Sequence, residues 1–259
     1  QRTLAPLGEV IALDFPEVDF SKPQDLAKLV QEVQPDILVN PAAYTAVDKA
    51  ESEQEIVYLV NRDSPAVLAE AAAKLRIPFL HYSTDYVYDG SKGSAYVETD
   101  PTNPLNVYGK SKLEGDDAVL AAGGAGLVLR TSWVYSMRQA GFVTKVLQWA
   151  RQQEVMRVVD DQVSGPTSAR MLAEVSALIL ARAGSDAYGW LCERTGVYHC
   201  AGDGACSRYE WAEKILELDP KKEEQKVQRL DRARSNEFSV PADRPMISVL
   251  NKEKLEKTF

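Results

Sequence analysis

The chain has 259 residues, of which 45% are hydrophobic and 26% charged, enough for one large α/β domain or a domain with a smaller lobe. Thirty basic against 38 acidic residues give a net charge of -8, which argues against nucleic acid or an anionic membrane as a partner. No apolar run approaches the roughly 18 residues of a membrane-spanning helix. The cysteines are odd in number and lack metal-ligand spacing, so we predict reduced thiols, a cytoplasmic location and no metal: Cys192, Cys200 and Cys206.

The first residues lack the features of a translation start or a signal peptide. Gln1 is not a methionine, and the opening segment has neither a basic start nor a long apolar stretch. It is typical of a helix that ends at Pro6 and Gly8. We therefore expect a further piece of polypeptide to precede Gln1.

Hydrophobic patterning predicts alternating strands and helices through the first half of the chain. A short apolar run over 9–14 predicts a buried strand, and Ser21 is placed to cap a helix with apolar residues at helical spacing. A strand at 37–40 precedes a helix from about Ser64. Further strands are predicted at 77–83 and 126–132, with a helix between them that begins near Tyr108 and carries Lys112.

The alternation continues less regularly in the second half. We predict helices at about 142–153 and 168–183, and strands at 155–160 and 197–201. Ser207 and Glu210 form a capping-box pattern at the start of another helix. The tail from Leu218 is charged, with short apolar segments at 227–230 and 246–250.

Such alternation predicts an α/β fold with a Rossmann-like, doubly wound parallel sheet. We expect residues 1–150 to form a dinucleotide-binding domain, and 151–259 to form mainly a smaller, interleaved substrate lobe. Segments 155–183 and 196–201 are expected to return to the sheet. Ligands of such sheets bind beyond the carboxyl ends of the strands, so polar residues there are the candidates for function.

The strongest candidate group combines Tyr108 and Lys112 with Thr84. Tyrosine and lysine four residues apart share one face of a helix, and an ammonium group beside a phenol lowers the pKa of the phenol. Such a tyrosine can exchange a proton with a substrate oxygen, and the Thr84 hydroxyl can hold the same oxygen. This is the proton half of a carbonyl–alcohol redox reaction, whose hydride half requires a nicotinamide.

At this point the sequence resembles the extended short-chain dehydrogenase/reductases, and among them the dTDP-4-dehydrorhamnose reductase family. The match rests on seven segments in the order and spacing of that family: 40–51, 81–90 (HYSTDYVYDG), 104–114 (PLNVYGKSKLE), 130–135, 161–167, 196–199 and 244–245. The resemblance implies NADPH- or NADH-dependent reduction of the C4 ketone of dTDP-4-dehydro-L-rhamnose to dTDP-L-rhamnose, in nucleotide-sugar biosynthesis. It leaves the choice between NADH and NADPH, the nucleotide base and the oligomeric state open, with a homodimer among the alternatives.

The resemblance also implies roles for individual residues. Tyr108 would give the proton to the C4 oxygen, Lys112 would orient the nicotinamide ribose, and Thr84 would hold the keto oxygen. The implied substrate contacts are Thr84, Asp85, Trp133 and Arg244. The implied cofactor contacts are Asp14, Asp19, Phe20, Ala43, Tyr44, Thr45, Tyr108 and Lys112.

Several of these residues also have a purely structural interpretation. Trp133 could be a core residue, and Arg244 could form an exposed ion pair. His81 and His199 lie in apolar strands, where packed core histidines are more common than catalytic ones. Tyr135, Phe142 and Tyr198 are predicted to be packing residues.

The sequence departs from the family pattern at its ends. The family opens with a strand and a Gly-x-x-Gly-x-x-Gly turn that holds the pyrophosphate, and this chain instead begins where the following helix should end. The family also continues for about one more helix beyond Phe259. We therefore expect the sequence to be a trimmed form of a functional enzyme.

Two other functions remain as alternatives. Dehydratases of the superfamily place an Asp-Glu pair after the threonine, whereas Asp85 and Tyr86 follow Thr84 here. A nucleotide-sugar epimerase would use the same tyrosine and lysine. A non-catalytic regulatory subunit, as in the beta subunit of methionine adenosyltransferase, would use the fold to serve a partner enzyme.

Overall fold

The computed structural model describes residues 2–259 and contains a four-stranded parallel sheet, while Gln1 lies outside the described residues. The strands lie in the order β1 (Leu38–Asn40), β2 (Phe79–Thr84), β3 (Gly126–Thr131) and β8 (Gly196–His199). In register, Asn40 pairs with His81, and Thr84 pairs with Thr131. This confirms the predicted α/β class with a parallel sheet.

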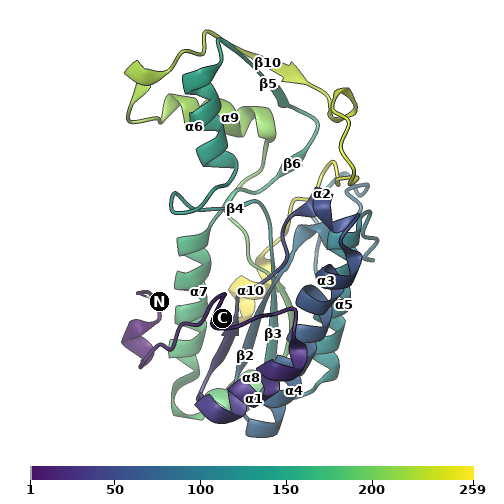
Figure 1. Cartoon of the computed structure of the whole chain (residues 1–259). Coiled ribbons are helices and arrows are strands. Elements are labelled where there is room, and N and C mark those ends of the chain that lie inside the picture. Colours follow the sequence, from purple (N-terminus) through teal and green to yellow (C-terminus); the bar gives the residue numbers. More distant parts are fainter. Residues whose placement is uncertain (1) are drawn as a thin grey trace.

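Helices cover both faces of the sheet (Figure 1). On one face, α1 (Pro23–Val33), α4 (Ser64–Leu75) and α5 (Val107–Ala121) pack against apolar side chains such as Phe79 and Val128. On the other face, α7 (Ala169–Ala183), α8 (Ala187–Cys192) and α10 (Glu253–Thr258) pack against Leu80, Leu127 and Leu129. Burial on both faces explains why these strands are almost continuously apolar.

Short helical segments connect the long elements. Between β1 and α4, the chain forms α2 (Val47–Ala50), α3 (Gln54–Tyr58) and the π-helical turn η2 (Leu59–Asp63). Short 3-10 turns occur at η1 (Ala5–Leu7), η3 (Asp85–Val87), η4 (Gly184–Asp186), η5 (Lys222–Glu224) and η6 (Ser235–Glu237). Within residues 2–259 no helix has the length and apolar character needed to cross a membrane.

The predicted strand at 9–14 is wrong. These residues are irregular, and Ile11 and Leu13 are 58% and 44% exposed. The apolar pattern is present, but a parallel strand is stable only beside a neighbouring strand. Among residues 2–259, no strand pairs with this segment. The Ser21 cap is also wrong, because α1 begins after Lys22 without a side-chain cap, and the Ser21 hydroxyl donates to Asp19.

A smaller lobe lies beyond the carboxyl end of the sheet (Figure 1). It consists of α6 (Phe142–Gln152), α9 (Arg208–Glu217) and a parallel pair formed by β5 (Val155–Val159) and β10 (Arg229–Ala233). The expected return of 155–160 to the main sheet is therefore wrong, because β5 pairs with β10. By contrast, α7 packs on the main sheet and β8 belongs to it.

Two short pairs of strands join the lobe to the sheet. The first pairs β4 (Val134–Tyr135) with β7 (Thr167–Ser168), and the second pairs β6 (Val163–Ser164) with β9 (Cys206–Ser207). The predicted capping box at the start of α9 is confirmed: the Glu210 amide donates to Ser207 Oγ (3.1 Å), and the Ser207 amide donates to the Glu210 carboxylate (2.7 Å).

Candidate active site

The start of α5 is fixed by side chains from distant parts of the chain. Asn106 caps the helix by accepting from the Gly109 amide (2.8 Å), and the Glu51 carboxylate accepts from the Val107 amide (2.8 Å). Asn106 Nδ2 also donates to the Asp243 carbonyl (2.6 Å). The helix that carries Tyr108 is thereby tied to the segment that carries Arg244.

Two glycines let α5 approach its neighbours closely. A Cβ atom at Gly109 would lie 2.3 Å from the Tyr86 carbonyl oxygen, and one at Gly115 would lie 2.1 Å from that of Asn61. Side chains larger than hydrogen do not fit at either position. This close packing brings Tyr108 over the end of β2.

Tyr108 lies beside Thr84 and Tyr86. Its ring meets the Tyr86 ring edge to face, with centroids 5.6 Å apart. Burial raises the pKa of Tyr108 well above its ordinary value, and a hydrogen bond with Thr84 opposes that rise. The phenol therefore keeps its proton in this structure.

Lys112 lies one turn further along α5 and does not lower the pKa of Tyr108 here, contrary to our expectation. The side chain is fully buried, and its Nζ atom donates to the Tyr82 carbonyl (2.7 Å) and lies 3.0 Å from His81 Nε2. Burial lowers the pKa of Lys112 to about 8, while nearby Asp116 opposes this. The amino group of Lys112 is thus directed to β2.

Asp85 follows Thr84 and is buried among hydroxyl groups. Its carboxylate accepts hydrogen bonds from Ser248 Oγ (2.5 Å), Thr84 Oγ1 (3.2 Å) and Ser164 Oγ (3.4 Å). Burial raises the pKa of Asp85 to about 6, although these hydroxyl groups and Arg208 oppose the rise. The site thus holds a carboxyl group that titrates near neutral pH.

Trp133 lies where the chain passes from β3 to the small lobe. It has a left-handed backbone conformation (φ 42°), which is strained for a residue with a side chain. Its ring stacks on Trp211 with centroids 5.5 Å apart, and the Arg208 guanidinium lies 3.6 Å from its ring centroid. The Trp133 ring is therefore both packed in the lobe and close to a cation.

Arg244 and Arg208 converge near Tyr86. Arg244 forms an ion pair with Asp48 (2.7 Å), as its structural interpretation predicts. The Arg244 side chain is mostly buried, however, and not exposed as that interpretation expects. The hydrogen bond with Asp48 raises the pKa of Arg244 against the effect of burial, whereas burial and the charge of Arg244 lower the pKa of Arg208 although Tyr86 opposes this. Two like charges close together favour an anionic ligand between them.

The loop after β1 is held by a buried asparagine. The Tyr44 amide donates to Asn61 Oδ1 (2.8 Å), and Asn61 Nδ2 donates to the Tyr44 carbonyl (3.1 Å) and to Ser111 Oγ (3.0 Å). Ser111 in turn donates to the Tyr108 carbonyl (2.9 Å). Ala43 and Thr45 flank Tyr44 in this loop, which is therefore fixed to the turn of α5 that carries Tyr108.

The remaining predicted cofactor residues precede α1. The Asp19 carboxylate accepts from the Ser21 amide (2.9 Å), and the Phe20 carbonyl accepts from Ser64 Oγ (2.6 Å), which fixes the Phe20 backbone to α4. A pocket of about 440 Å³ lies beside them, lined by Ser21 and by residues of 52–59. Asp14 lies in the exposed stretch, and its carboxylate accepts from the Phe15 amide (2.8 Å).

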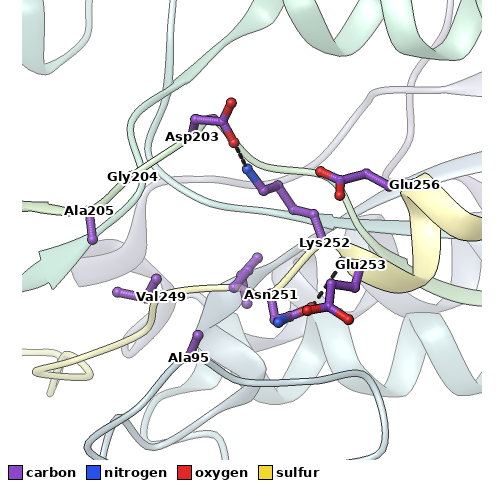
Figure 2. A pocket seen from close by; sticks show the side chains of 11 residues that line it. Ala95, Asp203, Gly204, Ala205, Val249, Asn251, Lys252, Glu253 and Glu256 are labelled. Atoms are coloured by element: carbon purple, nitrogen blue, oxygen red, sulfur yellow. Dashed lines mark hydrogen bonds and ion pairs between the residues drawn. The ribbon is translucent and has the colours of Figure 1, made fainter.

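A second pocket of similar volume, about 440 Å³, lies away from this group (Figure 2). Lys252 crosses its opening to form an ion pair with Asp203, and Glu253 and Glu256 of α10 lie on one side. Thr84, Tyr108 and Lys112 do not line it. Its position and its small, mixed lining give it no part in the chemistry of Tyr108. Among residues 2–259 no cluster of metal-ligating side chains occurs.

The sequence does not indicate every residue of the site. His81 is predicted to be a packing residue, and no role is predicted for Asn61, Ser111 or Arg208. Asn61 and His81 act through contacts 50 and 31 residues away in sequence, which no local pattern indicates. Arg208 is the first residue of a helix with a capping box in the substrate lobe, and this position is the feature of the sequence that could have indicated it.

Comparison with known proteins identifies the family of this chain. The family model described as the RmlD substrate binding domain matches residues 1–259. A dTDP-4-dehydrorhamnose reductase of Burkholderia thailandensis is 41% identical over 261 residues, covering all of this chain and 87% of the relative. The chain belongs to the dTDP-4-dehydrorhamnose reductase family. The corresponding enzyme of Escherichia coli K12 is 38% identical, with the same coverage.

Solved structures of reductases of this family have the same fold as this chain. A dTDP-4-dehydrorhamnose reductase from Clostridium acetobutylicum superposes with a TM-score of 0.86 at 32% identity, over 99% of this chain and 88% of that one. A reductase of Bacillus anthracis in complex with NADP gives 0.85 at 28% identity, over 98% and 85%. The family, the oxidoreductase class and the nicotinamide cofactor predicted from the sequence are confirmed.

Proposed function

We propose that this member of the family reduces the C4 ketone of dTDP-4-dehydro-L-rhamnose to the alcohol of dTDP-L-rhamnose with NADPH or NADH. One observation carries the proposal: the Tyr108 phenol and the Thr84 hydroxyl meet at the carboxyl end of β2, with Lys112 one helical turn away. Two hydroxyl groups directed to one point can bind and protonate a single carbonyl oxygen.

The protonation state of Tyr108 suits reduction. Because burial keeps the phenol protonated, Tyr108 can give its proton to the oxygen that gains charge as the C4 ketone becomes an alkoxide. Thr84 would donate a second hydrogen bond to that oxygen once its hydroxyl turns from Asp85, and its backbone is fixed by pairing with Thr131 of β3. When bound, the nicotinamide supplies the hydride.

Cofactor binding would fall to the residues between the sheet and α5. Lys112 has the position to donate to ribose hydroxyl groups once its amine leaves β2. The loop of Ala43, Tyr44 and Thr45 is proposed to line the cofactor, because the Tyr44 hydroxyl donates to Glu53, which lines the pocket beside Ser21. Asp19 and Phe20 at that pocket suit the adenine end, and Asp14 is proposed to meet the adenosine ribose. The donor set of hydroxyl, amine and backbone groups fits a dinucleotide.

The sugar nucleotide would bind between the sheet and the small lobe. Thr84 and Asp85 lie where β2 ends and η3 begins, Trp133 lies where the chain passes from β3 to the small lobe, and Arg244 lies in the segment after η6. We accordingly assign 1–150 to the dinucleotide and 151–259 mainly to the substrate. A homodimer stays one of the alternatives for the assembly, which sedimentation velocity would test.

The test is the Tyr108→Phe variant, which removes the proton donor and keeps the ring. We expect the rate of NADPH oxidation with the dTDP-4-keto sugar to fall by about 10²–10⁴-fold, with cofactor affinity little changed. Tyr188→Phe on α8 makes the same chemical change far from Thr84 and should leave the rate intact.

Three outcomes would contradict the proposal. A Tyr108→Phe variant as active as the unsubstituted protein would remove Tyr108 from the reaction. Isomerisation of the sugar without net NADPH consumption would establish the epimerase. An unchanged cellular function in Tyr108→Phe would establish the regulatory subunit.

A further inference from the structure

His81 lies on β2 between two hydrogen-bond donors and is fully buried. Its Nδ1 atom is 3.2 Å from the side-chain nitrogen of Asn40, and its Nε2 atom is 3.0 Å from Lys112 Nζ. Asn40 and Lys112 are themselves 2% and 1% exposed, so water does not complete these bonds. A neutral imidazole has one N–H group and one bare nitrogen, so the two contacts must differ.

The backbone decides which nitrogen is bare. Asn40 Oδ1 accepts from the Ala42 amide (3.1 Å), and this fixes the side-chain amide with its NH₂ group toward His81. The Asn40 backbone carbonyl also lies within hydrogen-bond reach of the ring, but in this amide orientation a proton on Nδ1 would face the Asn40 NH₂ group. We therefore assign the proton of the imidazole to Nε2. Burial and the nearby Lys112 hold the pKa of His81 well below its ordinary value, which excludes the doubly protonated ring.

An Nε2–H group pointing at Lys112 requires an acceptor. An ammonium group has three donors and no lone pair, whereas a neutral amine can accept from His81 and donate to the Tyr82 carbonyl at 2.7 Å. A charged Lys112 would leave two donors facing each other in a buried site. The burial that lowers the pKa of Lys112 to about 8 acts in the same direction.

The other charged and titratable groups around Lys112 do not reverse this. Asp116, on the same face of α5, favours the ammonium form, but its Oδ2 atom accepts from Arg130 Nε (3.0 Å) in a buried ion pair. Tyr108 on the preceding turn remains a neutral phenol. No ion pair to Lys112 occurs among residues 2–259.

We propose that His81 is a positioning residue that, in the cofactor-free protein, holds Lys112 against β2 as a neutral amine. Leaving β2 to meet a ribose would then be accompanied by uptake of a proton from solvent. The part of Lys112 in cofactor binding rests on the proposed function, whereas the neutral amine rests only on these contacts.

Nitrogen NMR of the histidines tests the tautomer without cofactor. The chain has two histidines, and His199 is an internal reference because its Nδ1 lies 3.0 Å from the Asn251 carbonyl and its Nε2 lies 2.8 Å from the Tyr88 hydroxyl. His199 should therefore carry its proton on Nδ1, and His81 on Nε2. A proton on Nδ1 of His81, donated to the Asn40 backbone carbonyl, would overturn the proposal.

Lysine NMR tests the amine. With ¹⁵N-lysine, the Nζ signal that disappears in Lys112→Met should titrate near pH 8. His81→Gln offers Lys112 a carbonyl oxygen, which accepts from the ammonium, so the midpoint should rise by about one pH unit or more. His81→Leu removes the N–H group that donates to the neutral amine and should raise the midpoint by a smaller amount, whereas a fall would show that His81 accepts from the ammonium. A midpoint unchanged in His81→Gln would contradict the proposal.

Kinetics separates this inference from the proposed function. The pH midpoint of kcat/KM for NADPH should move in His81→Gln in step with the Nζ signal, while KM for the sugar nucleotide stays unchanged. If the NMR results hold and the protein has no reductase activity, the proposed function fails and the neutral amine stands. If reductase activity is present and the Nζ midpoint does not move, the neutral amine is wrong and the proposed function stands.

Discussion

At the scale of single residues, the buried Asp85 should lower the unfolding free energy of the protein as pH rises. Burial raises its pKa to about 6 from 3.8, so the unfolded chain releases the proton first as pH rises, and the folded state loses stability from about pH 4 to pH 6. Asp85→Asn removes this loss. Relative to the unsubstituted protein, the variant should gain about 3 kcal/mol of unfolding free energy between pH 4 and pH 7, measured by urea denaturation.

Asp89 provides a control of opposite sign. Hydrogen bonds from Ser91 hold its pKa below its ordinary value, so the stability it contributes is present above about pH 4 and is lost below that. Asp89→Asn should therefore lose stability relative to the unsubstituted protein as pH rises. A pH-independent difference for Asp85→Asn would show that the Asp85 carboxyl is not desolvated.

Arg208 should contribute to binding of the diphosphate. Its guanidinium is held over the Trp133 ring and near Arg244, where an anion would relieve the repulsion between like charges. Arg208→Met should raise KM for the sugar nucleotide by about 10–100-fold and leave KM for NADPH unchanged. An equal loss of affinity for dTDP and for thymidine would exclude a contact with the diphosphate.

The sequence was sufficient for the residues whose chemistry is local. Tyr108 and Lys112 share a helical face, and Thr84 ends a strand, as their spacing predicts. The pairing of Lys112 with His81 was beyond reach, because it depends on the separation of α5 from β2. That separation is set by Gly109 and Gly115, whose partners come from other parts of the chain.

At the scale of elements, the close approach of α5 to η2 should be sensitive to one added carbon. Gly115→Ala would place Cβ 2.1 Å from the Asn61 carbonyl oxygen, so the helix must move away from the loop of Tyr44. We expect a loss of about 1–3 kcal/mol in unfolding free energy and weaker NADPH binding. Gly141→Ala, where the added Cβ meets nothing within 4 Å, is the control. Equal effects of both substitutions would contradict this.

Strand patterns predicted the elements better than their pairing. The apolar runs at 9–14 and 155–160 have the same character, yet one is irregular and the other pairs with β10, about 70 residues later. Pairing depends on which segments lie adjacent in space. Periodicity along the chain carries no information about that.

At the scale of the whole molecule, the chain forms a four-stranded sheet covered on both faces by helices, and a smaller lobe beyond the carboxyl ends of its strands.

The short strand pairs that join the lobe to the sheet have a consequence for protein engineering. The chain leaves the sheet through β4 and returns through β7, which pair in parallel, and β6 pairs antiparallel with β9. The chain therefore passes between the sheet and the substrate lobe several times, and the lobe is not one continuous segment. Exchanging it between relatives would require several junctions cut in register, so a change of sugar preference is better sought by substituting individual side chains around Trp133.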